Sequence, residues 1–343
     1  MDPDHVEQMR LVYDPVLGDF RNLPGVVTRV PNFGSARGFS SKYPPHPEYC
    51  FGALRSALER FGYRDQETLF GAPYDFRYAP PLPGQTSRVY SRYFRRLMRL
   101  IEDARKKNQG RAAIVLGHSY GAMVAIEFVR NTPLSWRNKF IKHLFTVAPT
   151  WSGGYVRTIR SFASGPPGDL VYVPSASRLS VRSMWRTFEA AIVNLPCPEV
   201  FGRRPLVITK QNNYSAYDTA DLLLVIGSAD GVGPFKEREL AKMGYFKAPM
   251  VPMTHMYGVG LRTEEQLMYW EGDFDMPPEV VYGDGDGTIN TIAMLAFEDK
   301  VGKQPGQKER FKSFKVNKVP HSELVIDARA LKKIMDEIVE LNR

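Results

Sequence analysis

One stretch near the middle of the chain limits the fold more than any other. Residues 111–117 read Arg-Ala-Ala-Ile-Val-Leu-Gly, which is apolar at nearly every position, as in a strand buried on both faces of a parallel sheet. Apolar residues return from Met123 to Val129 at the spacing of a helix. A strand, a tight turn and a helix in this order predict a central strand of a helix-covered sheet.

The rest of the chain repeats this alternation. Apolar runs and helical periods predict strands at residues 25–30, 68–72, 142–147, 250–257, 279–282 and 311–319, and helices at 51–61, 87–107 and 322–341. Between residues 149 and 247 the rhythm gives way to stretches rich in Gly, Pro, Trp and Ser. We therefore predict a single α/β domain over residues 1–343, with an inserted cap over residues 149–247.

The charge of the chain suits an anionic partner. Lys and Arg outnumber Asp and Glu by 46 to 37, and a formal net charge of +9 fits nucleic acid or a membrane surface with acidic lipids. No nucleic-acid-binding motif accompanies the charge, so we expect no nucleic-acid partner. The predicted helix at 87–107 suits either a solvated face or contact with acidic head groups. Its basic residues include Arg88, Arg92, Arg95, Arg99 and Lys106.

We expect neither a membrane span nor an export signal in this sequence. No window reaches the roughly 18 apolar residues that a span needs. The first residues, Met-Asp-Pro-Asp-His, carry acid where a secretory signal has Lys or Arg. The compartment in which the chain works stays open.

The turn after the buried strand holds the first candidate for chemistry. Gly117-His-Ser119-Tyr-Gly121 fits the pattern G-x-S-x-G, whose glycines let the backbone turn so tightly that the serine hydroxyl is exposed at the end of the strand. The alternative is a serine in an ordinary strand-to-helix turn. Because a buried strand precedes the motif and a helix follows it, we predict that Ser119 is a nucleophile.

The base that would activate this serine is selected by its position in the chain. A serine hydroxyl needs a histidine to take its proton and a carboxylate to orient that histidine, and with this turn the order is serine, acid, histidine. His321 follows the last predicted strand and precedes the closing helix, whereas the other five histidines lie too early. His321 is therefore the predicted base, with an exposed histidine at a helix start as the alternative.

The acid is expected in the loop Tyr282-Gly-Asp284-Gly-Asp286-Gly-Thr288, which follows a predicted strand. Spacing alone does not decide which of its two aspartates reaches His321. A calcium loop is a poor alternative because the later ligand positions are absent. A nucleotide-binding loop is excluded because no first strand-helix-strand unit precedes the glycines.

Several motifs together resemble the lecithin:cholesterol acyltransferase family, and its plant members most closely. The resemblance runs from about Leu11 to the C-terminus. It rests on the serine turn and on the segments Arg29–Gly34, Gly71–Arg77, Ile141–His143, Asn213–Tyr217, Tyr257–Gly260 and Tyr282–Thr288. This resemblance implies an α/β-hydrolase that needs no metal or other cofactor. Such an enzyme moves a fatty acyl group from a glycerophospholipid to a serine, and then to a sterol, another lipid or water.

The resemblance also implies roles for individual residues. The family's nucleophile falls on Ser119, its acid on Asp286 and its base on His321. The residue after the nucleophile, Tyr120, would supply one amide of the oxyanion hole. Lipid-facing groups are expected in the cap, where packing in the interior is the alternative for each aromatic residue. The candidates are Trp151, Met184, Trp185 and Phe188.

The chain also departs from the family pattern at its start. Family members usually begin with an apolar strand, a loop that gives the second oxyanion donor, and a flap that helps hold lipid. They also usually carry an export signal or a membrane anchor, which suggests the secretory pathway or a lipid surface. We expect this chain to lack these parts, with Pro31–Gly34 as another source of an amide. The second hypothesis is therefore a catalytically weak or inactive lipid-binding relative.

Overall fold

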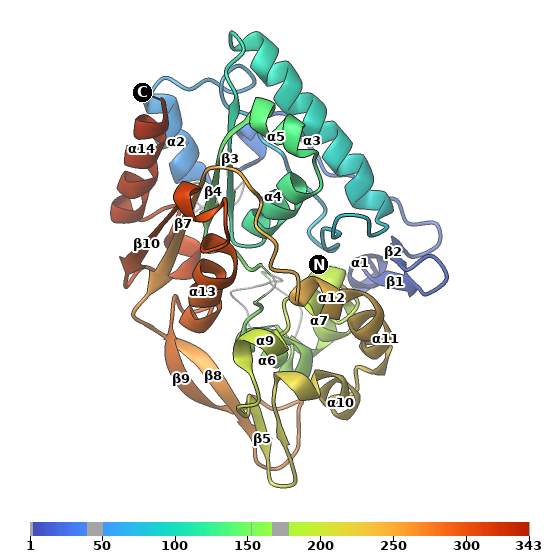
Figure 1. Ribbon diagram of the computed structural model, residues 1–343. Helices are drawn as coiled ribbons and strands as arrows, with labels where there is room; N and C mark the ends of the chain where they lie inside the picture. Colours follow the sequence, from blue (N-terminus) through green and yellow to red (C-terminus); the bar gives the residue numbers. More distant parts are fainter. Residues whose placement is uncertain (1–2, 40–50, 152, 167–177, 343) are drawn as a thin grey trace.

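The computed structural model describes residues 3–39, 51–151, 153–166 and 178–342 (Figure 1). Its central sheet is parallel and has the strand order β10-β7-β4-β3. The strands are β3 (Ala113–His118), β4 (Ile141–Val147), β7 (Met253–Val259) and β10 (Phe311–Asn317). The serine turn follows β3, and the later strands are added on one side of it. This arrangement of strands and covering helices confirms the predicted α/β-hydrolase fold.

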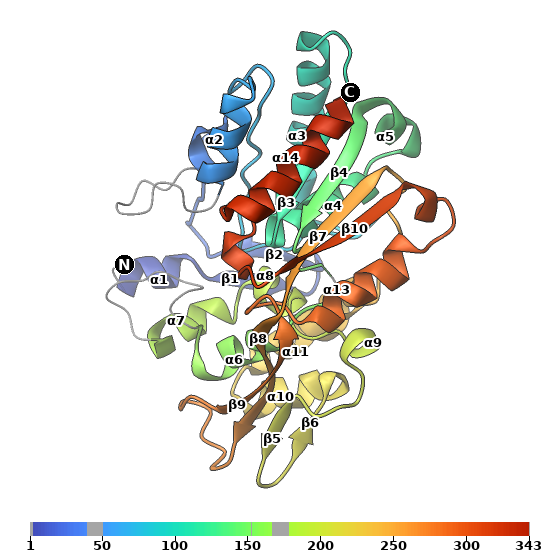
Figure 2. The same ribbon diagram turned by 90° about the vertical axis from the view of Figure 1, so that its left-hand side faces the viewer.

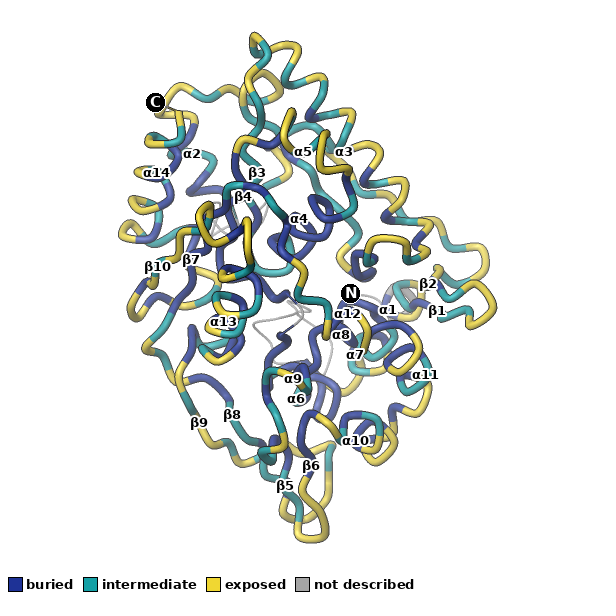
Figure 3. The backbone as a smooth tube through the Cα atoms, in the orientation of Figure 1, coloured by how far each residue is buried: buried dark blue, intermediate teal, exposed yellow. Residues whose placement is uncertain are grey.

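Helices cover both faces of the central sheet because neighbouring strand residues point to opposite faces. On one face, Phe145 and Val147 pack with α2 (Gly52–Arg60) and α14 (Ala328–Asn342), and Figure 2 shows α14 crossing the sheet. On the other face, Leu144 belongs to the larger core. The helices that contribute to this core include α3 (Arg88–Lys107), α4 (Tyr120–Arg130) and α13 (Thr291–Phe297). Figure 3 shows α4 buried and the outer side of α3 exposed.

A second sheet stands below the first in Figure 1, and its strand order is β6-β5-β8-β9. Its strands are β5 (Val207–Thr209), β6 (Asn213–Tyr214), β8 (Leu261–Tyr269) and β9 (Glu279–Gly285). β5 and β6 come from the predicted cap, whereas β8 and β9 follow it in the chain. The cap boundaries at 149 and 247 stay a prediction, and the segment inside them pairs with strands outside them.

Short elements complete the fold. The helices of the predicted cap are α6 (Val156–Ser164), α7 (Arg178–Trp185), α8 (Glu189–Val193), α9 (Pro198–Phe201), α10 (Thr219–Val225), α11 (Val232–Pro234) and α12 (Leu240–Met243). Near the N-terminus lie α1 (Pro3–Gln8) and the hairpin of β1 (Leu11–Asp14) and β2 (Asp19–Asn22), and α5 (Leu134–Phe140) precedes β4. The single-turn helices are η1 (Ala36–Phe39), η2 (Ala216–Asp218), η3 (Ala229–Gly231), η4 (Phe235–Glu239), η5 (Glu298–Gly302), η6 (Lys308–Arg310) and η7 (His321–Glu323). Within the described ranges, no helix combines the length and the apolar character needed to cross a bilayer.

Three expectations about strands are corrected by the structure. Residues 25–30 form no ladder, and residues 68–72 hold no more than an isolated bridge between Asp65 and Leu69. Apolar residues there are half-buried or, like Val27, exposed, without a strand beside them. β3, expected at the centre, is an edge strand among the described strands, and most of it is half-buried. β8 was not predicted, because its middle is charged.

Candidate active site

Ser119 stands in the turn between β3 and α4 in a backbone conformation that side chains rarely adopt, with φ 55° and ψ −127°. The two motif glycines make this turn sterically possible. A Cβ atom on Gly117 would lie 2.5 Å from the carbonyl oxygen of Gly121, so no side chain fits there. A Cβ atom on Gly121 would lie 3.3 Å from the hydroxyl of Tyr74. Strand and helix thus approach closely and leave Ser119 at the end of the strand.

His321 reaches Ser119 from the turn after β10. Its Nε2 lies 2.7 Å from Oγ of Ser119. Its backbone N–H donates to the carbonyl oxygen of Asp286 at 2.9 Å, which fixes the main chain on which the ring is carried. The histidine chosen by chain order and the serine chosen by the turn motif are therefore in hydrogen-bond contact.

Asp286 holds the other ring nitrogen of His321. Its Oδ2 lies 2.7 Å from Nδ1 of His321, while Oδ1 accepts the backbone N–H groups of Thr288 at 3.0 Å and Ile289 at 2.7 Å. The residue is only 1% exposed. A Cβ atom on Gly258 would lie 2.7 Å from Cβ of Asp286, so the glycine after Tyr257 makes room for the carboxylate.

Asp284 occupies a different position in the same loop. It is exposed, and its Oδ1 accepts the backbone N–H of Gly260 at 2.7 Å, while its Oδ2 accepts the hydroxyl of Thr291 at 2.7 Å. These bonds join β9 to the turn before β8 and to the start of α13. The structure therefore brings Asp286, and not Asp284, to His321.

His118 is a neighbour of the site to which chain order assigned no role. Its Nε2 lies 2.9 Å from the carbonyl oxygen of His321, an acceptor, so this nitrogen carries the proton. Loss of solvent is the main cause that lowers the pKa of His118 to about 3, which keeps the ring neutral near pH 7. His118 thus holds the main chain of His321. Its position directly before Ser119 in the serine turn is the signal that could have identified it.

The amide of Tyr120 lies at the start of α4, directly after Ser119. The first amides of a helix have no acceptor within the helix. The side chain points elsewhere, because its hydroxyl donates to the carbonyl oxygen of Tyr78 at 2.7 Å. Pro31–Gly34, the other expected source, does not line the cavity at Ser119, and the N–H of Gly34 donates to the carbonyl oxygen of Gly71 at 2.7 Å. The oxyanion role of Tyr120 stays a prediction.

A cavity of about 170 Å³ lies beside Ser119 and has mostly apolar walls. Of the four cap residues expected to face lipid, Trp185 and Phe188 line it. Their rings lie 5.8 Å apart, and Phe188 also packs edge-on against Phe76 at 6.0 Å. The remaining lining residues are Phe76, Tyr120, Thr150, Tyr155, Thr158, Ala190, Ala191 and Asn194. Sequence reasoning missed Phe76 and Tyr155, although Phe76 lies within a motif that it had singled out.

The other two cap candidates lie away from the cavity. Trp151 is 1% exposed and packs edge-on against Phe246 at 5.2 Å and Phe297 at 4.8 Å. Met184 is buried in the same core. For these two residues the structure shows interior packing, and neither lines the cavity at Ser119.

Comparison with known proteins links the chain to one family. The family model described as "Lecithin:cholesterol acyltransferase" matches residues 1–221. "Lecithin-cholesterol acyltransferase-like 1" of Oryza sativa subsp. japonica is 43% identical over 338 residues, which cover 98% of this chain and 74% of that protein. "Lysosomal phospholipase A and acyltransferase" of Homo sapiens is 29% identical, with 84% and 68% covered. "Phosphatidylcholine-sterol acyltransferase" of Mus musculus is 27% identical, with 96% and 72% covered.

Proposed function

Because the chain belongs to the lecithin:cholesterol acyltransferase family, we propose that it takes a fatty acyl group from a glycerophospholipid and passes it to a sterol, another lipid alcohol or water. The chain is an enzyme of the acyltransferase and phospholipase type with a serine-hydrolase fold. Two relatives support a phospholipid as the donor. One is named "Lysosomal phospholipase A and acyltransferase", and the other is named "Phosphatidylcholine-sterol acyltransferase". The donor is presented at a lipid surface, so we also propose a peripheral contact with lipid.

The proposed first half-reaction forms an acyl-serine. His321 Nε2 takes the proton of the Ser119 hydroxyl while Oγ attacks the ester carbonyl carbon. Asp286 keeps Nδ1–H of the ring in the right tautomer and stabilises the cation that forms. The tetrahedral intermediate then breaks its bond to the glycerol oxygen, which takes the proton from His321 and leaves as a lysophospholipid. The Tyr120 amide donates to the negatively charged oxygen in this step.

The second half-reaction repeats the same proton path with another nucleophile. A hydroxyl of the acceptor or a water molecule gives its proton to His321 and attacks the acyl-serine carbonyl. The intermediate then releases Ser119, which recovers the proton. The aromatic walls supplied by Phe76, Trp185 and Phe188 suit an acyl chain, because burial of apolar surface stabilises such a ligand.

One observation carries the proposal: the unbroken contact from Ser119 Oγ through His321 to Asp286, with 2.7 Å at both links. The test is labelling with a fluorophosphonate, which reacts with activated serines, followed by analysis of products from one phospholipid. We expect labelling of the protein and none of Ser119→Ala. Ser135→Ala, which changes an exposed serine on α5, is the matched control and should label normally.

The product analysis separates the acceptors. Vesicles that contain one phospholipid and a sterol would yield free fatty acid when water accepts, and acyl-sterol when the sterol accepts. Labelling without either product would favour a slow enzyme. Lipid binding without labelling would favour the inactive lipid-binding relative instead.

A further inference from the structure

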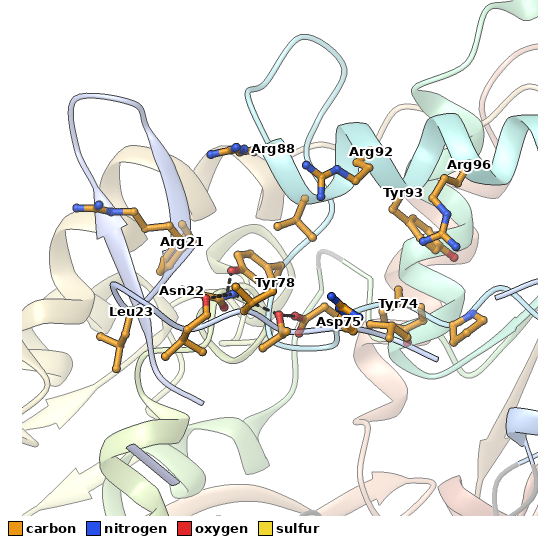
Figure 4. Close-up of a pocket in the computed structure, with 18 residues that line it drawn as sticks. Arg21, Asn22, Leu23, Tyr74, Asp75, Tyr78, Arg88, Arg92, Tyr93 and Arg96 are labelled. Carbon is orange, nitrogen blue, oxygen red and sulfur yellow. Dashed lines mark hydrogen bonds between the residues drawn. The ribbon is translucent and has the colours of Figure 1, made fainter. Parts of the chain in front are cut away.

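A pocket of about 700 Å³ lies outside the candidate active site, between helix α3, residues 20–30 and the loop at 73–78. Figure 4 shows Arg88, Arg92 and Arg96 along α3, above a floor that includes Tyr74 and Tyr78. Arg21 and Arg29 line the pocket from the opposite segment. These five arginines define what is called the arginine pocket below.

The positive charge of the arginine pocket is largely uncompensated. Within the described part of the chain, the side chains of Arg29, Arg88 and Arg92 have no carboxylate or other hydrogen-bond partner. Arg21 lies 3.7 Å from the half-buried Asp14, and Arg96 stacks over the ring of Phe33. Such a group of guanidinium side chains attracts anions, and guanidinium groups bind phosphate oxygens with two parallel hydrogen bonds.

The acidic residue that lines the pocket is already paired with another arginine. Asp75 is the carboxylate among the described lining residues, and its Oδ2 pairs with Arg77 at 2.7 Å. Arg77 is fully buried and does not line the pocket. Asp75 is therefore neutralised by Arg77, and Arg29, Arg88 and Arg92 are left free to meet an anion.

Apolar side chains border the same charge and are unusually exposed. Val27, in the pocket wall, is 81% exposed, and Val16 and Leu17 in the β1–β2 turn, close in sequence to Arg21, are 93% and 63% exposed. Arginines that bind phosphates next to apolar side chains that enter the acyl region are the combination found on proteins that bind a membrane interface. A soluble polyanion would not explain the exposed valines and leucine.

The arginine pocket is next to the candidate active site. One loop separates them, because Tyr74, Asp75 and Tyr78 line the arginine pocket while Phe76 lines the cavity at Ser119. A bilayer held at the pocket would therefore present phospholipid within one loop of Ser119.

We propose that the arginine pocket binds the head groups of acidic phospholipids and holds this enzyme on a negatively charged membrane. The inference rests on the proposed function only for its biological meaning, since the binding itself requires no turnover. The sequence alone did not decide whether the basic residues of α3 face solvent or lipid. Under this proposal, Arg88, Arg92 and Arg96 meet lipid, and Arg95 and Arg99 face solvent.

The test measures binding of the Ser119→Ala chain to vesicles by flotation, so that the lipid is not consumed. One vesicle type contains phosphatidylcholine alone and the other contains about one-third phosphatidylserine. We expect much stronger binding to the acidic vesicles, weakened by added salt. Arg29→Gln/Arg88→Gln/Arg92→Gln in the same chain should lower affinity about 100-fold, from about a factor of five for each basic residue near an acidic surface.

The matched control removes the same charge from the same region without touching the pocket. Arg95→Gln/Arg99→Gln/Lys107→Gln changes three exposed residues of α3 that do not line it, and should lower affinity far less. Equal losses in the two triple variants would overturn the pocket in favour of diffuse attraction. Equal binding to both vesicle types would overturn it as well, as would full displacement by millimolar glycerol 3-phosphate. Turnover of a short soluble ester by the unmodified chain reports separately on the proposed chemistry.

Discussion

The central sheet and the helical segment between residues 189 and 242 are stabilised by different chemistry. The interior of the sheet is mostly apolar, and Phe145, Val147 and Met256 are fully buried there beside a few polar side chains such as His255. The helical segment instead buries charge. Glu189, Arg238, Glu239 and Lys242, called the charge cluster here, are each no more than 2% exposed.

The charge cluster joins parts of the chain that are far apart in sequence. Oε1 of Glu189 accepts from Lys242 Nζ and from Arg238 Nε, both at 2.6 Å, and its Oε2 accepts the backbone N–H of Ala79 at 2.9 Å. Burial opposes ionisation of Glu189, but Lys242 and Arg238 outweigh it and lower the pKa of Glu189. One carboxylate thus connects the cap helices to the loop before α3.

The central sheet and the charge cluster should respond differently to substitution, one in catalytic rate and the other in stability. A buried ion pair adds little net stability over apolar packing, yet removal of one partner leaves an uncompensated charge and is costly. The triad at the ends of β3, β9 and β10 is supported by an apolar sheet that does not depend on it. Triad substitutions should therefore change the rate alone, whereas substitutions in the charge cluster should change stability.

The largest effect is expected for Ser119→Ala. Loss of the proposed nucleophile should lower kcat/KM by roughly 10⁴-fold or more, as for other members of such triads. The free energy of unfolding should change by no more than about 0.5 kcal/mol, since the side chain supports no packing. Turnover of a short soluble ester and urea unfolding measure the two quantities. Near-normal turnover in this variant would mean that Ser119 is not the nucleophile.

Asp286→Asn is expected to come next. An amide at this position favours the wrong tautomer of His321, which should cost about 10³ to 10⁴ in kcat. Asp284→Asn is the matched control, because it changes the neighbouring aspartate of the same loop and keeps an acceptor for Gly260 N–H. Its effect should stay below about tenfold, and the reverse order of the two effects would contradict the choice of acid.

Glu189→Ala should have the largest effect on stability. It leaves Arg238 and Lys242 buried with one carboxylate fewer, so the free energy of unfolding should fall by about 3 to 5 kcal/mol. Glu271→Ala, which removes the exposed partner of Lys210, is the control and should change stability little. Urea unfolding measures both. If folded Glu189→Ala protein lost turnover, the charge cluster would affect the catalytic rate as well as stability, against the expectation.

The contact between Ser119 and His321 could be predicted from sequence because each residue belongs to a recognisable pattern. A buried strand followed by G-x-S-x-G marks Ser119, and chain order selects His321. The choice between the two aspartates could not be made from spacing, because it depends on space beside Gly258 and on the amides of Thr288 and Ile289. The family resemblance indicated Asp286, and the geometry has the same residue at His321.

The charge cluster and β8 could not be predicted, for a common reason. Polar residues of β8 argue against a strand until their partners are known, and Glu264 pairs with Arg160 while Glu265 pairs with Arg204. These partners lie 61 or more positions away in the chain. Residues 25–30 show the opposite failure, because an apolar run predicts a strand whether or not a neighbour is present to pair with it.

The smallest change for a single step in conditions is expected in the pH dependence of stability, at most about 1.4 kcal/mol for each pH unit, and its sign differs between the two regions. In the sheet, burial lowers the pKa of His255 from 6.5 to about 3. The unfolded chain then binds a proton that the folded chain does not, so stability is lost as pH falls below 6.5. In the charge cluster, burial raises the pKa of Glu239 from 4.5 to about 8. Here the folded chain holds the extra proton, so stability is lost as pH rises from 4.5 toward 8.

Two variants separate these two contributions to the curve of stability against pH. The loss of stability below pH 6.5 is its acid limb. His255→Phe keeps a ring beside Tyr257 and Phe297 and should flatten the acid limb, by up to about 1.4 kcal/mol for each pH unit. The limb should not vanish, because burial also lowers the pKa of His143 to about 4. Glu239→Gln should flatten the limb between pH 4.5 and 8 and leave the acid limb unchanged. Urea unfolding at several pH values measures both slopes. If each variant altered the other limb instead, the sheet and the charge cluster would not titrate independently, and the contrast between the two regions would fail.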